Sequence, residues 1–265
     1  MKNLIFVKLG GGLITDKNKP YTSRLDVIDR LCREINQAGK ENKFNLVLGN
    51  GVGSFAHTSA KKYKTIEGFI NNQSKYGFCK VHNDAAEISK IVINSLLKAG
   101  EKVFSIAPSS CFLTRRSKIV DSYLKIIKKL LDYGIIPVVY GDVAVDLEKG
   151  SSILATEDTF VYLAKKLKPK KIILVSKVNG VYTDDPIKNE RAEFIPRINK
   201  KNWKKIKEYL KGSDGIDVTG GMAQKVEKSI ELAKTGCKVL IINGNKPNYL
   251  KRVLLGETLG TLIEW

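Results

Sequence analysis

Two short apolar segments of this chain each run into a cluster of glycines, and this pattern constrains the fold more than any other feature. Residues 4–9 read as a buried strand that stops at residues 10–12, and residues 44–48 read as a strand that opens the turn of residues 49–53. Because glycine has no Cβ, a turn between a strand and a helix can bring backbone N–H groups close to a phosphate. The pattern therefore predicts an α/β protein whose ligands bind at the carboxyl ends of parallel strands.

Charged side chains stand next to both turns. Lys8 lies near the carboxyl end of the first strand, where a lysine is unfavourable unless it faces a cleft or a counter-ion. Lys17, in the polar loop that follows, is a weaker signal because loops commonly carry lysines for solubility. His57 closes the second turn, although a simple phosphate cradle needs no histidine. We therefore expect Lys8 and His57 to belong to a site that does more than hold an anion.

A third glycine turn lies in the second half of the chain. Gly220 and Gly221 open a helix whose first turns carry Lys225, placed to reach a phosphate at the helix start. Asp142 follows the strand of residues 135–140, where its side chain could orient lysines in the crevice or cap a turn. The first turn lacks the ending of the Walker motif and the spacing of the dinucleotide fingerprint, so neither motif applies.

The remaining pattern is that of an alternating α/β chain, long enough for one broad domain or two lobes that share a sheet. The apolar spacing predicts helices over residues 26–38, about 82–98, 123–133, 156–166 and 200–210. Further strands are expected at residues 102–107, 135–140, 172–175, 238–243 and 260–263. His82 is interpreted as an ordinary residue in the first turn of its helix and not as a ligand.

The composition argues against several classes of protein. A formal net charge of +19 attracts nucleic acids, anionic membranes and phosphorylated ligands alike, but residues 165–171 and 200–211, the densest basic segments, lack the interleaved aromatic residues of a base-stacking surface. We therefore expect a solvated lysine-rich surface and no nucleic-acid partner. No apolar run has the length of a membrane span, and the N-terminus does not read as a signal peptide. The 4 cysteines form no CxxC pair, which predicts reduced thiols, no zinc site and a cytoplasmic location.

Taken in this order, the motifs resemble the amino-acid kinase superfamily and, within it, the isopentenyl phosphate kinases. The resemblance covers essentially the whole chain. Each loop alone is weak evidence, but their conjunction, with a histidine closing the second glycine turn, is strong. The matching residues are 8–11, 16–18, 20–21, Gly51, Gly53, Phe55, His57, 60–63, 108–110, 141–142, Ser213, 216–222, Lys225 and 243–245.

The resemblance implies a three-layer αβα sandwich with a mainly parallel central sheet. It divides the chain into an N-terminal lobe, residues 1–147, for acceptor binding and dimerisation, and a C-terminal lobe, residues 148–265, for the nucleotide, with one continuous sheet. The implied reaction is the ATP-dependent phosphorylation of isopentenyl phosphate to isopentenyl diphosphate, in isoprenoid biosynthesis by the mevalonate pathway. Mg²⁺ is implied to arrive with ATP, and a homodimer to form through the helix near residues 82–98.

The resemblance also implies roles for individual residues. His57 binds the acceptor phosphate, and Asp142 holds the lysines in place. The residues implied to contact or border the acceptor are Val52, Gly53, His57 and Gly141. The residues implied to contact ATP are Lys8, Gly10, Gly11, Gly12, Lys17, Gly53, Lys177, Gly180, Gly221 and Lys225. No residue is implied as a metal ligand.

Some positions depart from the family pattern on both sides of the expected site. Asn50 replaces a histidine or serine, and Val52 and Ala56 replace glycines. On the nucleotide side, Lys177 and Asn179 stand where the family often has aspartates, and residues 155–158 (Ala-Thr-Glu-Asp) replace Ser-Gly-Asp-Asp. These departures bear on the details of binding more than on the reaction.

Three alternatives stay open. The first is a kinase of another small phosphate or phosphonate, such as the fosfomycin kinases, which resemble the chain in the same loops. A uridylate kinase is less favoured because that relative lacks a histidine at this point. The third is a basic nucleic-acid-binding protein that keeps the fold without catalysis. An isoprenoid tail needs an apolar tunnel, for which core packing is a nearly equal explanation of the candidates Phe69, Tyr76, Phe78, Cys79 and Phe112.

Overall fold

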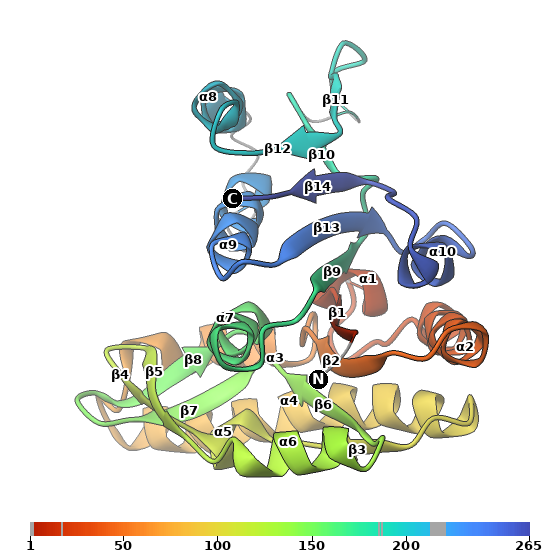
Figure 1. The fold of residues 1–265 in the computed structure, drawn as a ribbon. Helices are drawn as coiled ribbons and strands as arrows, with labels where there is room; N and C mark the ends of the chain where they lie inside the picture. Colours follow the sequence, from red (N-terminus) through yellow and green to blue (C-terminus); the bar gives the residue numbers. More distant parts are fainter. Residues whose placement is uncertain (1–2, 17, 185, 187, 213–220) are drawn as a thin grey trace.

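The computed structural model describes residues 3–16, 18–184, 186, 188–212 and 221–265 (Figure 1). Within these ranges the main sheet has 8 strands, all parallel to their neighbours except β14 against β13, so the mainly parallel sheet is confirmed. In spatial order the strands are β12 (Arg197–Ile198), β14 (Thr261–Ile263), β13 (Lys238–Asn243), β9 (Lys171–Ser176), β1 (Leu4–Leu9), β2 (Asn45–Asn50), β6 (Ile136–Tyr140) and β3 (Val103–Ser105).

Helices cover both faces of this sheet, as the three-layer prediction requires. The alternation of β1 divides the core: Ile5, Val7 and Leu9 pack on one side, and Leu4 and Phe6 pack on the other. The first face is covered by α1 (Gly11–Ile14), α2 (Leu25–Glu41), α4 (Asn72–Lys98) and α10 (Tyr249–Leu255). The second is covered by α6 (Lys125–Asp132), α7 (Thr156–Leu167), α8 (Trp203–Gly212) and α9 (Gly221–Ala233). In Figure 1, α2 and α10 lie on the opposite side of the strands from α7 and α9.

A second sheet extends from the carboxyl side of β6. Its strands, in spatial order, are β5 (Lys118–Ser122), β4 (Phe112–Arg115), β7 (Asp142–Asp146) and β8 (Gly150–Leu154). The lobe boundary expected between residues 147 and 148 therefore falls inside the antiparallel β7–β8 hairpin. The remaining short elements are α3 (Ala56–Lys62), the 3₁₀ helix η1 (Thr65–Glu67), α5 (Pro108–Cys111), and the paired strands β10 (Val181–Tyr182) and β11 (Phe194–Ile195).

Helix α4 begins well before the expected position near residue 82. Asn71 Oδ1 accepts the N–H of Ser74 at 2.9 Å, and Ser74 Oγ accepts the N–H of Asn71 at 3.1 Å, which forms a capping box at the true start. His82 consequently lies in the interior of the helix, so its interpretation as a first-turn residue is wrong. Because the helix starts early, its first half packs beside the second glycine turn, where Phe78 and Val52 share one apolar cluster.

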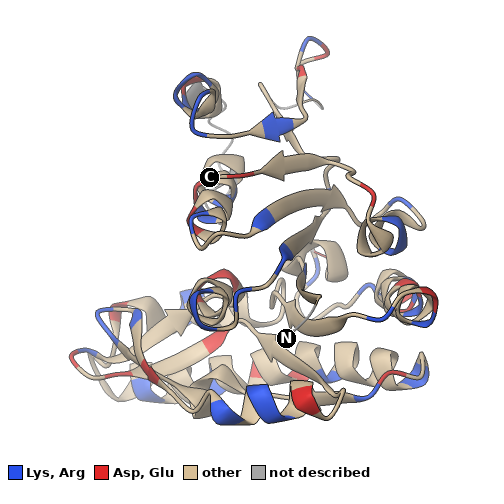
Figure 2. Cartoon of the chain, viewed as in Figure 1, with Lys and Arg blue, Asp and Glu red and all other residues tan. Residues whose placement is uncertain are grey.

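Lysine and arginine are spread over most helices and several loops, as the dispersed charge of the sequence predicts (Figure 2). Among the described residues, no helix combines the length and the apolar character needed to cross a membrane. Cys32, Cys111 and Cys237 are buried, and Cys79 is exposed. Burial raises the pKa of the Cys32 thiol to about 12, so this thiol is unreactive at neutral pH.

Candidate active site

The first and second glycine turns pack directly against each other. A Cβ on Gly11 would lie 2.5 Å from the backbone N of Gly53, and a Cβ on Gly51 would lie 2.6 Å from the backbone N of Gly11. Gly53 also has a φ of +51°, in the left-handed region that favours glycine. Only residues without a side chain fit at these positions, and the predicted juxtaposition of the two turns is confirmed.

Lys8 lies at the end of β1 on the face covered by α7. Its Nζ forms an ion pair with Glu157 Oε1 in the first turn of that helix. The helix start is fixed to β2 because Thr156 Oγ1 donates to the carbonyl of Asn50 at 2.8 Å. Burial favours a raised pKa for Glu157, but the Lys8 ammonium outweighs it and holds the pKa below its usual value. Glu157 therefore stays ionised and can hold Lys8 in place.

Lys225 approaches the same carboxylate from α9. Its Nζ donates to Ser176 Oγ at 3.0 Å, at the end of β9, and its positive charge contributes to the lowered pKa of Glu157. Glu157, at the start of α7, thus holds Lys8, and Ser176, at the carboxyl end of β9, holds Lys225, so the two lysines lie on one side of the glycine turns, as expected for a phosphate site. Lys17 and the third glycine turn up to Gly220 lie outside the described residues, and Gly221 is the first residue of α9.

Asp142 has other partners than the expected lysines. Its carboxylate is 3% exposed and accepts hydrogen bonds from the N–H groups of Ser109 at 3.2 Å and Val143 at 2.8 Å. His82 Nδ1 lies 3.1 Å from Asp142 Oδ1, and this hydrogen bond raises the pKa of His82. Asp142 was expected to orient the lysines, but the carboxylate that holds Lys8 is that of Glu157. Asp142 instead joins α4, α5 and β7 beside Gly141.

The residues expected around the acceptor are mostly brought together. A Cβ on Gly141 would lie 3.4 Å from Val52 Cγ1, and the N–H of Gly141 donates to the carbonyl of Asn50 at 3.1 Å. His57 is exposed in the first turn of α3, and its N–H donates to the carbonyl of Gly53 at 3.4 Å. Val52, Gly53 and Gly141 therefore lie close together, and His57 lies nearby in the first turn of α3.

An apolar cluster adjoins these residues and accounts for the side chains of Val52 and Ala56, where the family has glycines. Its buried members are Ala56, Val81, Ala85, Tyr140 and Val143, with Val52 and Phe78 among the side chains packed against it. Ala56 is 2% exposed, so its methyl group fills space that a glycine would leave empty. Asn50 is fully buried, and its Oδ1 has no hydrogen-bond partner among the described residues.

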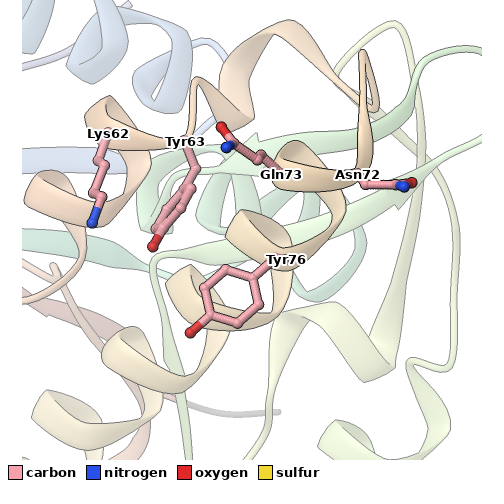
Figure 3. Close-up of a pocket in the computed structure, with 5 residues that line it drawn as sticks. All are labelled: Lys62, Tyr63, Asn72, Gln73 and Tyr76. Atoms are coloured by element: carbon pink, nitrogen blue, oxygen red, sulfur yellow. The ribbon is translucent and has the colours of Figure 1, made fainter.

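The tunnel candidates divide between this region and the core. Phe69 and Phe78 pack edge to face with ring centroids 5.4 Å apart, whereas Phe112 is buried in the core on the α7 face against Tyr162. Tyr76 is 60% exposed and lies with Lys62, Tyr63, Asn72 and Gln73 around an open pocket of about 460 Å³ (Figure 3). Core packing is therefore the correct explanation for Phe112.

The residues expected on the nucleotide side lie around the carboxyl ends of β9 and β13. The Nδ2 of Asn245 donates to the carbonyl of Lys177 at 3.3 Å, and Asn243 Nδ2 donates to Asn179 Oδ1 at 3.0 Å. Gly180 has a φ of +151°, and a Cβ there would lie 2.4 Å from Thr261 Oγ1. Gly180 thus permits close packing against β14, and Lys177 opens the loop that leads to it.

A sequence model described as the Amino acid kinase family matches residues 3–243. The chain belongs to the amino acid kinase family. It is 36% identical to the isopentenyl phosphate kinase of Methanocaldococcus jannaschii over 99% of both proteins. It is 32% identical to the isopentenyl phosphate kinase of Methanothermobacter thermautotrophicus over 98% of both.

This amino acid kinase also resembles solved structures of isopentenyl phosphate kinases. An isopentenyl phosphate kinase crystal structure superposes with a TM-score of 0.84 at 28% identity, covering 98% of this chain and 100% of the other. A substrate complex of an isopentenyl phosphate kinase superposes with a TM-score of 0.79 at 25% identity, with the same coverage. The aspartate kinase of Synechocystis, at 15% identity and a TM-score of 0.68, shares the fold and is covered over 39% of its length.

Sequence reasoning missed two groups in this member of the family. Glu157 was noted only as part of a departure at residues 155–158, although its acidic side chain at the start of a helix was the available signal. Ser176 gave no signal, because a serine at a strand end is common. Among the described residues, no group of three histidines, cysteines or acidic residues could hold a metal ion.

Proposed function

We propose that this chain is an ATP-dependent kinase that phosphorylates isopentenyl phosphate to isopentenyl diphosphate. The observation that carries the proposal is the packing of the two glycine turns, with Lys8 on one side and Val52, Gly53 and Gly141 on the other. Because the two turns touch, their backbone N–H groups lie close together, and a donor and an acceptor phosphate can bind next to each other along their edge. The similarity to isopentenyl phosphate kinases over nearly the whole chain supports this acceptor.

The reaction needs neutralisation of charge and in-line positioning more than proton transfer. An oxygen of the acceptor phosphate attacks the γ-phosphorus of ATP, and the bond between that phosphorus and the β–γ bridging oxygen breaks to release ADP. The second pKa of a phosphate monoester is about 6, so at neutral pH the acceptor is mostly a dianion and needs no general base. His57 therefore serves as a hydrogen-bond donor to the acceptor phosphate.

The chain's own cations act on the donor side. Glu157 and Ser176 hold Lys8 and Lys225 where their ammonium groups stabilise the charge that develops on the transferred phosphoryl group. Lys17, Gly10, Gly11, Gly12 and Gly221 complete the phosphate contacts, and Lys177 and Gly180 belong to the nucleotide loop. The narrow glycine turns and two gathered lysines fit the triphosphate of ATP. Mg²⁺, bound with ATP, supplies further positive charge to the phosphates.

We place the isoprenoid tail next to Val52, at the edge of the apolar cluster. Phe78 and Val52 pack against that cluster as partly buried side chains, which gives this side of the glycine turn an apolar lining. A C₅ tail transferred from water to such a surface gains about 0.8 kcal/mol for each buried methylene group. This favours an isoprenoid acceptor over the more polar fosfomycin or a nucleotide.

We also assign the acceptor to an N-terminal lobe of residues 1–147 and the nucleotide to a C-terminal lobe of residues 148–265. We further propose that the active protein is a cytoplasmic homodimer in the mevalonate pathway.

The test of function is a coupled assay of ADP release with isopentenyl phosphate, dimethylallyl phosphate, fosfomycin and UMP as acceptors. We expect isopentenyl phosphate to give the highest kcat/KM. Preference for fosfomycin or UMP would reassign the acceptor, and salt-sensitive nucleic-acid binding without turnover of any acceptor would support the non-catalytic alternative.

A further inference from the structure

The loop between α1 and α2, described at residues 15, 16 and 18–24, is hydrogen-bonded to the backbone of Ser54, the residue that follows the second glycine turn. The N–H of Ser54 donates to Thr15 Oγ1 at 3.1 Å, and the carbonyl of Ser54 accepts the N–H of Tyr21 at 3.3 Å. Thr15 and Ser23 also form an antiparallel bridge that closes the loop. Both backbone polar groups of Ser54 therefore depend on the position of this loop.

Tyr21 has an unusual backbone conformation for its residue type. Its φ of +53° lies in the left-handed region, which a Cβ disfavours, so the surrounding contacts must hold it there. Its ring packs edge to face on Phe55, with centroids 5.8 Å apart, and Lys80 Nζ lies 5.2 Å from the ring centroid. Phe55 immediately precedes α3, which carries His57. The ring of Tyr21 therefore packs on the residue that starts the helix of the histidine.

Asp84 anchors this tyrosine from α4. Its side chain is fully buried, and its Oδ2 accepts the hydroxyl of Tyr21 at 3.0 Å. Its Oδ1 forms an ion pair with Lys80, one turn earlier in the same helix, and this contact raises the pKa of Lys80. A buried carboxylate is unfavourable unless it is paired and hydrogen-bonded. Asp84 occupies a position on the inner face of α4 that core packing alone would fill with an apolar residue.

We propose that Asp84 and Lys80 position Tyr21, which in turn holds Ser54 and Phe55 so that the glycine turn and His57 are correctly placed for the acceptor phosphate. The inference rests on the proposed function, because it takes His57 as the ligand of that phosphate. Tyr21, Lys80 and Asp84, named here the Tyr21 clasp, do not touch the reacting atoms in this account. Their loss weakens acceptor binding much more than ATP binding.

The kinetic test changes one side chain of the Tyr21 clasp at a time. Tyr21→Phe keeps the ring on Phe55 but removes the hydrogen bond to Asp84, and we expect it to raise the KM for isopentenyl phosphate about tenfold, with the KM for ATP changed less than about twofold. Asp84→Asn retains an oxygen that accepts the Tyr21 hydroxyl, and Lys80, whose side chain is 36% exposed, can turn to water. This variant should therefore show a smaller rise than Tyr21→Phe.

The matched control is Tyr162→Phe, which also removes one hydroxyl hydrogen bond, to Ser122 Oγ at 3.0 Å, away from the glycine turns. We expect it to lower the melting temperature without changing either KM. If Tyr21→Phe lowers the melting temperature in the same way and leaves both KM values within about twofold, the Tyr21 clasp is only structural and the proposal is overturned.

Hydrogen exchange gives a readout that needs no substrate. In the unliganded protein, the amides of residues 53–58 should exchange about tenfold faster in Tyr21→Phe than in the wild type, and those of Tyr162→Phe should be unchanged. Unchanged exchange in Tyr21→Phe overturns the proposal. A wild-type protein that does not phosphorylate isopentenyl phosphate overturns the proposed function instead, because the exchange result stands independently of the acceptor.

Discussion

Lys8 has its ammonium group fixed by a carboxylate from a distant part of the chain. Its ion pair with Glu157 spans 149 residues of sequence, and both side chains are largely shielded from solvent. An ammonium held in this way needs little reorganisation as charge develops on a transferred phosphoryl group. We therefore propose that the pair serves catalysis more than stability, since buried ion pairs contribute little net free energy of folding.

Replacement of Lys8 by methionine should lower kcat about 100-fold or more, while the KM for ATP rises less than about fivefold, because the positive charge acts mainly in the transition state. Glu157→Gln should lower kcat about tenfold by releasing Lys8, and the double variant should be hardly slower than Lys8→Met. Steady-state kinetics of the four proteins measure this coupling. Additive losses would mean that Glu157 acts separately from Lys8. The control is Lys207→Met, in the exposed Lys207–Glu227 pair, which should leave kcat unchanged.

His57 is the residue that we assign to the acceptor phosphate. His57→Ala should lower kcat/KM for isopentenyl phosphate about 10- to 100-fold through both KM and kcat, because a hydrogen bond to a charged group contributes about 1.5–3 kcal/mol. Titration of each substrate at saturation of the other measures the effect. Thr58→Ala, at the next exposed position of α3, is the matched control and should behave as the wild type. A His57→Ala enzyme with unchanged kinetics would remove the histidine from the site.

At the scale of elements, α4 is tied to the start of β7 through His82 and Asp142. The hydrogen bond to Asp142 raises the pKa of His82 above its usual value of 6.5, so the folded protein favours the protonated ring. The stabilisation is fully present below pH 6.5 and is lost as the pH rises through the folded pKa. Its size should stay below about 1 kcal/mol because the side chain is more than one-third exposed.

The prediction is that His82→Gln lowers the free energy of unfolding more at pH 5.5 than at pH 8.5. Urea denaturation of the wild type and the variant at the two pH values measures the difference. His57→Gln, which changes the other histidine of the chain, is the control and should show no comparable pH dependence if the effect belongs to the α4–β7 contact. An equal loss at both pH values would contradict the role of His82 protonation.

The sequence was sufficient to predict the elements whose signals are local. The glycine turns are visible in the sequence because Gly11, Gly51 and Gly53 must lack a Cβ where the two backbones touch. The start of α4 was misplaced because Gly77 lowers the helical propensity there, whereas the fold needs it: a Cβ at Gly77 would lie 2.2 Å from Tyr63 Cβ. Tertiary packing against α3 overrides the local preference.

Partners between distant residues could not be predicted in the same way. Whether Lys8 meets Glu157 or Asp142 depends on which face of the sheet each side chain points to, and on how α7 docks on β2 through Thr156 and Asn50. A single sequence shows which charged residues are available for pairing, but not which of them meet in the fold. For the same reason, the buried Asp84 and its contact with Tyr21 were not anticipated.

At the scale of the whole molecule, the two halves of the chain meet in the middle of one sheet. Strands β1, β2, β6 and β3 come from residues 4–140, and β12, β14, β13 and β9 come from residues 171–263, with β1 and β9 as neighbours. Lys8 at the end of β1 and Ser176 at the end of β9 therefore face the same crevice from the two halves. For the lobes that we propose for donor and acceptor, a continuous sheet across this junction favours fixed alignment of the two phosphates.

The far edge of this sheet is where we place the homodimer contact. Strand β3 is the edge strand beside α4, and Phe104 on β3 and Leu97 on α4 are each 53% exposed. An unpaired strand with exposed apolar side chains is a template for association, and a second copy would cover both. Phe104→Asp together with Leu97→Asp should convert a dimer into a monomer in analytical ultracentrifugation, because two charges would be buried at the contact. Leu147→Asp, at a residue 51% exposed between β7 and β8, should leave the dimer intact, and a double variant that stays dimeric would place the contact elsewhere.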